Sequence, residues 1–285
     1  MPLSPSGQVT AALVLAAGLG ERLRPLTEAK PKPLLALDGR PLIYYPLMML
    51  KRAGVRRVAI NLHHLGPLIE QALGNGSVLG LEIIYAPEPM LLNTGGPLVA
   101  LREFFGNQTF WVANSDTILD FDLGAMVEFH RRHGSLATLA LRSRARDAGY
   151  SLVETDAEGR VRRVRLVKGP AGARDAAGGG QHEYSEGVAA YDDYPAAAPA
   201  GAPSELLPHI FCGLTLCEPS IVDFAPKRPA FGIVSHLLAP MVARGAAIYG
   251  YAFDGYFRTV DDLGSYQALS AEFASGAPPL SYLPR

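Results

Sequence analysis

A glycine-rich turn followed by basic residues is the part of this sequence whose residue types are best suited to binding phosphate. The apolar run 11–16 leads into Ala17-Gly18-Leu19-Gly20, and four cations follow closely in sequence: Arg22, Arg24, Lys30 and Lys32. Phosphate oxygens need backbone N–H groups at close range, and residues without bulk at Cβ allow that approach. Nearby cations would stabilise charge that shifts during group transfer. The stretch therefore predicts a triphosphate site at the carboxyl end of a buried strand.

The spacing excludes two familiar phosphate-binding motifs. The dinucleotide fingerprint G-x-G-x-x-G is incomplete after Gly20, and no Gly-Lys-Ser/Thr follows to form a P-loop. Taken alone, the same residues are also compatible with an ordinary strand-to-helix turn and a basic surface loop. The assignment therefore depends on a longer pattern.

The composition indicates a globular chain without an overall charge field. The 285 residues are 48% hydrophobic and 19% charged, and 26 Lys+Arg against 27 Asp+Glu give a formal net charge of -1. Nucleic-acid binding usually needs a basic surface, so we expect no nucleic-acid partner. The first residues carry no basic leader and their apolar run breaks at Gly18. We therefore expect no signal peptide, no membrane span and a cytoplasmic protein.

Apolar strands alternate with helical patterns along most of the chain, which predicts βαβ units and a mainly parallel sheet. The expected strands are 11–16, 55–62, 81–86, 109–114, 136–142, 209–217 and 246–253. The expected helices are 41–53, 66–73, 95–105, 123–133, 234–243 and 264–274. Residues 151–167 are expected to form a hairpin, and the only two cysteines, Cys212 and Cys217, to be buried and unpaired.

We expect residues 1–285 to form a single domain with one insertion. Residues 169–208 are dominated by Ala, Gly and Pro and lack apolar periodicity. A structureless stretch of this length is unusual inside a compact domain, which favours a flexible insertion and leaves a lid as the alternative.

The run from Leu15 to Leu34 reads L-A-A-G-x-G-x-R-L-x-P-L-T-x-x-x-P-K-P-L, and it resembles the signature of the sugar-1-phosphate nucleotidyltransferases. The resemblance implies a nucleotidyltransferase domain with the family's three-layer, Rossmann-like α/β fold, a mainly parallel sheet flanked by helices. It also implies the substrates and reaction: a nucleoside triphosphate and a hexose 1-phosphate give a nucleotide sugar and pyrophosphate. Further landmarks in the same order extend the resemblance over most of the chain outside 169–208.

The resemblance assigns roles to residues of two turns. It implies that Arg22 and Lys32 contact the phosphates and act in catalysis. It implies that the nucleotide is bound, partly through backbone, by residues of the first turn: Leu15, Ala16, Ala17, Gly18 and Gly20. The later turn 93–96 (Asn-Thr-Gly-Gly) is similar to the family's small-residue turn before a helix, where Thr94 and Gly95 would approach the base or sugar. A helix N-cap at this turn is compatible with that role.

The resemblance further implies a Mg²⁺ cofactor, a hard cation that prefers carboxylate and phosphate oxygens. Asp116 follows an apolar strand, as the family's metal-binding Asp does, although Ser115 stands where the family has Gly. Lys168 lies where the family often has a Glu-Lys pair for the sugar phosphate, but Val167 replaces the Glu. An exposed strand-end lysine is an equal alternative for Lys168.

The second metal carboxylate is predicted to be Asp262. The sequence Asp262-Leu263-Gly264-Ser265 matches the family's Asp-Ile/Val-Gly-Thr before the last helix, with conservative replacements. A different register would place Thr259 at this position, and Asp261 is an acidic neighbour that complicates the assignment.

The sequence leaves the identity of the base and the sugar open. Residues 61–96 resemble a branch that includes short mannose-1-phosphate guanylyltransferases and N-acetylmuramate-1-phosphate uridylyltransferases. Within this segment, His63 and His64 have no third metal ligand spaced nearby, so we expect them to be polar residues at a strand end.

Two other functions fit parts of the sequence. One is a catalytically weak regulatory homologue that binds nucleotide sugars, suggested by Ser115, Val167 and the uncertain second carboxylate. The other is a glycosyltransferase, because Asp120-Phe121-Asp122 has the spacing of an Asp-x-Asp metal motif. The glycine-rich turn argues against the glycosyltransferase.

Overall fold

The computed structural model describes residues 8–143, 152–167, 191–195, 206–276 and 280–283, in two compact units. The first unit comprises Met1–Leu91, Asn107–Leu123 and Gly255–Arg285, and the second comprises Leu92–Gly106 and Gly124–Asp254. Each unit is thus assembled from segments that are distant in sequence. That both units act as one nucleotidyltransferase domain stays a prediction.

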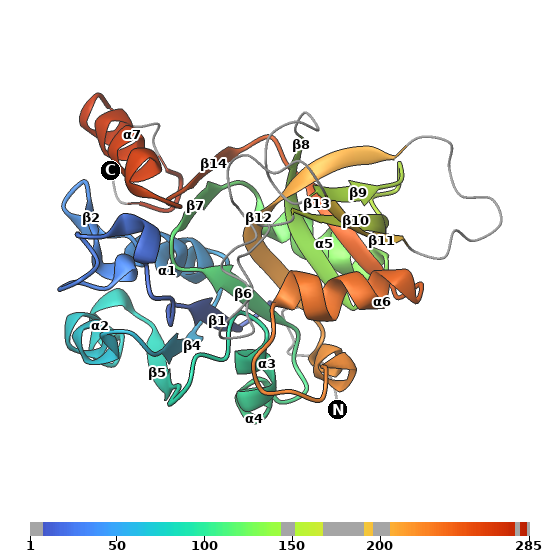
Figure 1. The fold of residues 1–285 in the computed structure, drawn as a ribbon, viewed down its shortest axis with the longest axis horizontal. Coiled ribbons are helices and arrows are strands. Elements are labelled where there is room, and N and C mark those ends of the chain that lie inside the picture. The colour runs from blue at the N-terminus through green and yellow to red at the C-terminus, as the bar shows by residue number, and fades with distance from the viewer. Residues whose placement is uncertain (1–7, 144–151, 168–190, 196–205, 277–279, 284–285) are drawn as a thin grey trace. The chain divides into compact units, whose positions relative to one another are not determined.

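The first unit is built on four parallel strands in the order β6-β1-β4-β5 (Figure 1). Their bounds are β1 Ala11–Leu15, β4 Arg57–Leu62, β5 Glu82–Pro87 and β6 Phe110–Asn114. Continuous apolar runs suit parallel strands because helices cover such sheets. Residues 11–14 and 58–62 are accordingly buried. The expected α/β class, with a mainly parallel sheet and flanking helices, is confirmed in this unit.

In its described residues, the first unit contains three α-helices and three short 3₁₀ turns. They are α1 Tyr44–Arg52, α2 Gly66–Leu73 and α7 Leu263–Ala274, with short 3₁₀ turns at Glu21–Leu23, Lys32–Leu34 and Ser77–Leu79. The first helix begins later than expected. Pro41 lies in strand β3 (Arg40–Pro41), which pairs with β2 (Ala36–Leu37). The chain just before α1 therefore forms a small hairpin.

A short antiparallel ribbon, absent from the sequence-based expectation, completes the first unit. Strand β7 (Thr117–Asp120) continues from β6 and pairs with β14 (Tyr256–Thr259). Just beyond the ribbon, the Val260 N–H donates to the carbonyl of Asp116 at 3.1 Å. The ribbon thus brings Asp116 to the segment that opens α7, and Figure 1 shows its two strands side by side.

Gly255 at the start of this ribbon is expected to tolerate no side chain. A Cβ there would lie 2.0 Å from the Asp120 carbonyl, which is backbone and cannot move aside cheaply. Gly255→Ala is expected to lower the free energy of unfolding by about 1–3 kcal/mol in urea denaturation, the usual range for overpacking. Gly264→Ala is the matched control, because its Cβ would meet only Asp262 Oδ1 at 3.6 Å. Equal urea concentrations at the midpoint of unfolding for the two variants would contradict this prediction.

The second unit is mostly antiparallel. Its strands are β8 Ala137–Ser143, β9 Leu152–Thr155, β10 Val161–Val167, β11 Tyr191–Pro195, β12 Leu207–Cys217 and β13 Ile248–Ala252. Only β13 pairs in parallel among the described pairs within this unit, with β8. The hairpin expected over 151–167 is confirmed as β9 and β10. Strand β11 lies inside 169–208, and most of that stretch falls outside the described residues.

The helices of the second unit differ in detail from those expected. The segment 95–105 forms two pieces, α3 Gly96–Ala100 and α4 Arg102–Phe105, and 233–243 begins as a π-helix, Ile233–Leu238, before α6 Ala239–Ala243. Helix α5 is Leu123–Arg132, of which Leu123 belongs to the first unit, and a 3₁₀ helix spans Pro219–Phe224. Cys212 and Cys217 in β12 are buried and free, as expected. Among the residues that the structure describes, no helix has the length and apolar character to span a membrane.

Candidate active site

The glycine-rich turn follows β1 at the carboxyl edge of the parallel strands. Gly20 has φ 66°, in the left-handed region that favours glycine. A Cβ at Gly20 would lie 2.9 Å from Cγ2 of Thr27, whose hydroxyl donates to the Gly20 carbonyl at 2.7 Å. The turn therefore needs glycine for both its conformation and its packing, and Thr27 closes the loop behind it.

A buried polar pair that the sequence analysis missed holds the start of this turn. Asn61 Oδ1 accepts from the Ala16 N–H at 2.9 Å, and Asn61 Nδ2 donates to Glu88 Oε1 at 2.8 Å. Asn61 and Glu88 are buried, with relative exposures of 2% and 6%. Burying such groups is favourable only when they are hydrogen-bonded, so this pair fixes the backbone where β1 ends. An Asn within the apolar strand 55–62 was the signal available in the sequence.

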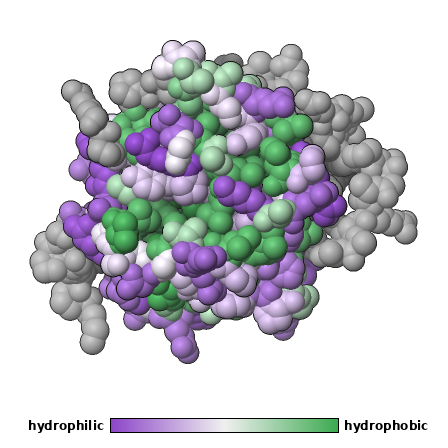
Figure 2. All heavy atoms as spheres, turned by 90° about the vertical axis from the view of Figure 1, so that its left-hand side faces the viewer, coloured by the Kyte–Doolittle hydropathy of each residue, from purple (hydrophilic) through white to green (hydrophobic). Residues whose placement is uncertain are grey.

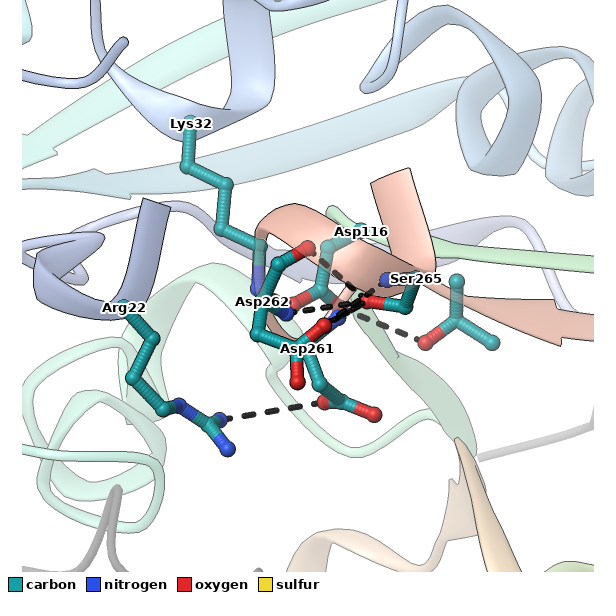
Figure 3. A network of polar contacts seen from close by, with 7 residues as sticks. Arg22, Lys32, Asp116, Asp261, Asp262 and Ser265 are labelled. Atoms are coloured by element: carbon teal, nitrogen blue, oxygen red, sulfur yellow. Dashed lines mark hydrogen bonds and ion pairs between the residues drawn. The ribbon is translucent and has the colours of Figure 1, made fainter. Parts of the chain in front are cut away.

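Lys32 and Asp116 form an ion pair at the carboxyl edge of the sheet (Figure 3). Lys32 opens a 3₁₀ turn after Pro31, and Asp116 follows β6. Their side chains are 15% and 19% exposed, which shields the pair from solvent. The Thr117 hydroxyl donates to the other oxygen of Asp116 at 3.3 Å. The two residues most strongly implicated by the sequence pattern are therefore brought into direct contact.

Asp261 provides a second carboxylate in the same cluster, paired with a second cation. Its Oδ1 lies 3.8 Å from Nη2 of Arg22, and its side chain is 19% exposed. Burial raises the pKa of Asp261, the negative charge of Asp116 raises it further, and Lys32 and Arg22 oppose this shift. Arg22 and Lys32 thus face two carboxylates that arrive from distant parts of the chain.

Asp262 has a different local role, since it is the N-cap of α7. Its Oδ1 accepts from the Ser265 N–H at 2.8 Å and lies 2.8 Å from the Ser265 hydroxyl, while the Asp262 N–H donates to that hydroxyl at 2.9 Å. This reciprocal arrangement is a capping box. The Ser265 N–H, and then its hydroxyl, lower the pKa of Asp262. The match of Asp262 to a metal ligand stays a prediction, and only its Oδ1 is committed to these capping contacts.

Removing this cap is expected to cost stability in a pH-dependent way. Asp262→Ala is expected to lower the free energy of unfolding by about 1 kcal/mol at pH 7, whereas Asp262→Asn should retain the cap. Because the folded-state pKa is lowered, the charge-dependent part of this stabilisation is present above the unfolded pKa, about 3.9. It is lost as pH falls through the depressed folded value. Urea denaturation at pH 7 and pH 3 should therefore show a smaller wild-type advantage over Asp262→Ala at the lower pH.

Three further residues were predicted to contact the substrates: Thr94, Gly95 and Lys168. Thr94 and Gly95 belong to the second unit, where Thr94 Oγ1 accepts from the Ile233 N–H at 2.9 Å and the Gly95 N–H donates to the Phe231 carbonyl at 2.8 Å. They fasten their turn to the segment before α6. Lys168 lies outside the described residues. Their nucleotide and sugar-phosphate roles stay predictions.

The donor chemistry of the cluster fits a hard divalent cation. Asp116 and Asp261 are partly buried carboxylates with opposing cations, and Asp262 adjoins them (Figure 3). Among the described residues, no group of three or more His, Cys, Asp or Glu is placed to hold a metal ion. Substrate phosphate oxygens would have to complete the coordination, which is usual for Mg²⁺.

Three residues that the sequence analysis considered as possible metal ligands have structural partners: His63, His64 and Asp120. His63 Nδ1 donates to the Glu88 carbonyl at 2.8 Å, and His64 Nε2 donates to the Thr27 carbonyl at 3.1 Å. Asp120 accepts from the Ser281 N–H at 2.5 Å and from its hydroxyl at 2.6 Å. Asp120 therefore anchors the C-terminal segment, which argues against an Asp-x-Asp metal motif.

The face of the molecule in Figure 2 carries interspersed hydrophobic and hydrophilic side chains. Leu26, Leu68 and Val78 are among the exposed large apolar residues of the first unit. Exposed apolar residues of this kind are common and need no ligand to explain them. The candidate site is therefore identified by its partly buried charges.

A known protein family matches most of this sequence. The sequence model of the nucleotidyl transferase family matches residues 11–199. N-acetylmuramate alpha-1-phosphate uridylyltransferase from Neisseria meningitidis is 48% identical over 115 residues, which cover 40% of this chain and 50% of the relative. Mannose-1-phosphate guanylyltransferase from Mycobacterium tuberculosis is 28% identical over 269 residues, covering 94% and 66%. The matches thus span about half to two thirds of these relatives.

A solved structure shares the fold over nearly the whole chain. HddC from Yersinia pseudotuberculosis, complexed with GMP-PN, superposes with a TM-score of 0.66 at 18% identity, covering 93% of this chain and all of that one. At this identity the likeness concerns the fold alone. The arrangement of the strands and helices is therefore that of a known class of structure.

Proposed function

The chain belongs to the nucleotidyl transferase family, and from this premise we propose that it joins a nucleoside triphosphate to a sugar 1-phosphate with release of pyrophosphate. The observation that carries the proposal is the pairing of Lys32 with Asp116 and of Arg22 with Asp261, next to a glycine turn at the carboxyl edge of parallel strands. Two cations facing two partly buried carboxylates suit a reaction between polyanions.

The proposed reaction requires no covalent bond between the protein and a substrate. A phosphate oxygen of the sugar 1-phosphate attacks the α-phosphorus, and the bond to the β-phosphate breaks so that pyrophosphate leaves. The barrier arises from bringing two anions together in line, so positioning and electrostatics dominate. Arg22 and Lys32 are proposed to neutralise charge on the α- and β-phosphates. Backbone groups of the glycine-rich turn are proposed to bind the nucleotide.

The proposal includes Mg²⁺. When bound, it would neutralise phosphate charge and orient the triphosphate, and Asp116 and Asp262 are the carboxylates proposed to hold it. Thr94 and Gly95 are proposed to approach the base or sugar, and Lys168 the sugar phosphate. These roles come from the family pattern, and the described contacts of Asp116 support its part in them.

The relatives define which substrates should be tried first. One is named a uridylyltransferase for an N-acetylmuramate phosphate and the other a guanylyltransferase for mannose 1-phosphate. We therefore propose UTP or GTP as the nucleotide and a hexose-type 1-phosphate as the acceptor.

A substrate matrix tests the proposal. The four common nucleoside triphosphates are combined with glucose, mannose and N-acetylmuramate 1-phosphates, and pyrophosphate and nucleotide sugar are measured with Mg²⁺ and with EDTA. Magnesium-dependent release with one pair well above the others is expected. Binding of nucleotide sugar without turnover of any pair would instead support the regulatory homologue.

A further inference from the structure

Two adjacent acidic residues at the start of α7 have different environments. Asp262 has φ -147° and ψ -176°, an extended conformation in which successive side chains point to opposite sides. The Ser265 hydroxyl accepts the N–H groups of both Asp261 and Asp262 at 2.9 Å. The capping box therefore turns Asp262 toward the helix and directs Asp261 toward the cation of Arg22 (Figure 3).

The contact between Asp261 and Arg22 is weak enough for a ligand anion to replace Asp261 as the partner of Arg22. The pair is separated by 3.8 Å, longer than a direct charge-assisted hydrogen bond of about 2.7–2.9 Å. Arg22 is 42% exposed, whereas Asp261 is 19% exposed. The Asp261 contact itself is therefore weak, and a ligand can replace it on the guanidinium at little cost.

We propose that Asp261 is a positioning residue for Arg22. Without ligand, the Asp261 carboxylate holds the guanidinium beside the glycine turn. When a triphosphate and a divalent cation bind together, the guanidinium leaves Asp261 and contacts the triphosphate. The proposal rests on the proposed function and adds a residue that the family pattern did not assign. It also explains why Asp261 and Lys32–Asp116 occupy one cluster.

The charges of the cluster give the physical reason for the coupling. Arg22 and Lys32 each face a carboxylate. A triphosphate that binds both cations must therefore replace the ion pairs that they form with Asp261 and Asp116. Two partly buried carboxylates would then be left without compensation, which is unfavourable. A divalent cation restores that compensation. Triphosphate and metal are therefore expected to bind as one unit, and weakly when supplied separately.

The test is a binding cycle on the intact chain. Each of the four common nucleoside triphosphates is titrated calorimetrically into wild type, Asp261→Asn, Arg22→Gln and the double variant, in EDTA and in excess Mg²⁺. For the triphosphate that wild type binds best with Mg²⁺, Asp261→Asn is expected to raise affinity in EDTA by about fivefold, as loss of one weak competing pair implies. The enhancement of affinity by Mg²⁺ should shrink accordingly. The double variant should show no such gain over Arg22→Gln.

A matched control comes from an ion pair elsewhere. Asp223 and Arg102 lie 2.9 Å apart on exposed side chains of the second unit, so Asp223→Asn removes a similar pair without touching the cluster. Its affinities should equal those of wild type. Thermal unfolding of every variant checks that the fold is retained, and Asp261→Ala removes the same carboxylate if Asp261→Asn does not fold.

Three outcomes would overturn the inference. They are unchanged affinity in EDTA for Asp261→Asn, a gain that persists in the Arg22→Gln background, and, when Mn²⁺ alone is titrated into Asp261→Asn, loss of Mn²⁺ binding without any gain in EDTA. The last would make Asp261 a metal ligand. If wild type releases pyrophosphate while any of these occurs, only this inference fails. If wild type neither binds a triphosphate nor releases pyrophosphate, the proposed function fails with it.

Discussion

Lys32→Ala is expected to lower kcat/KM by roughly 30- to 1,000-fold, a loss of about 2–4 kcal/mol of transition-state stabilisation. Lys32 is 15% exposed and pairs with Asp116, so its charge acts in a poorly solvated position. Alanine removes the cation that would meet the phosphates. It also leaves Asp116 with one opposing charge fewer. The measurement is steady-state turnover with the best substrate pair from the matrix.

Lys30→Ala is the natural control for this experiment. Lys30 lies two residues earlier in the same basic loop and is exposed. It therefore shares the overall charge of the loop without the contact to Asp116. Turnover of Lys30→Ala should stay within about threefold of wild type, since an exposed charge contributes little. Near-normal turnover of Lys32→Ala would show that its ion pair is structural.

Asp116→Asn is expected to reduce magnesium-dependent turnover by about 1,000-fold, or roughly 4 kcal/mol. Asparagine keeps the size of the side chain but removes the charge that opposes Lys32 and that is proposed to hold the metal. Mn²⁺ binding followed by electron paramagnetic resonance should weaken together with turnover. Parallel loss of both quantities is the expected signature of a metal-binding carboxylate.

Asp254→Asn provides the comparison for Asp116→Asn. Asp254 is an exposed aspartate of the second unit, and the same substitution there should leave turnover and Mn²⁺ binding unchanged. Turnover of Asp116→Asn within tenfold of wild type, with Mn²⁺ bound normally, would contradict the proposed role. Unchanged Mn²⁺ binding with lost turnover would point instead to the contact with Lys32.

Elements with a clear local pattern were predictable. The apolar runs that became β1, β4 and β6 are buried as expected, and α2 begins and ends where its pattern predicted. Such segments carry their own hydrophobic periodicity, so neighbours along the chain decide their structure. By contrast, the four-residue strands β7 and β14 carry too little pattern of their own, and each depends on a partner far away in sequence.

The residues of the candidate site also differ in whether the sequence alone could indicate them. By itself the sequence determined the glycine turn and its basic residues, because they lie in one short run, and the family pattern pointed to Arg22, Lys32 and, in a separate segment, Asp116. Only the tertiary structure decided that Asp261 rather than its neighbour faces Arg22. The physical reason is that a side chain's direction depends on pairing between distant segments. Here the β7–β14 ribbon and the capping box at Ser265 set that direction.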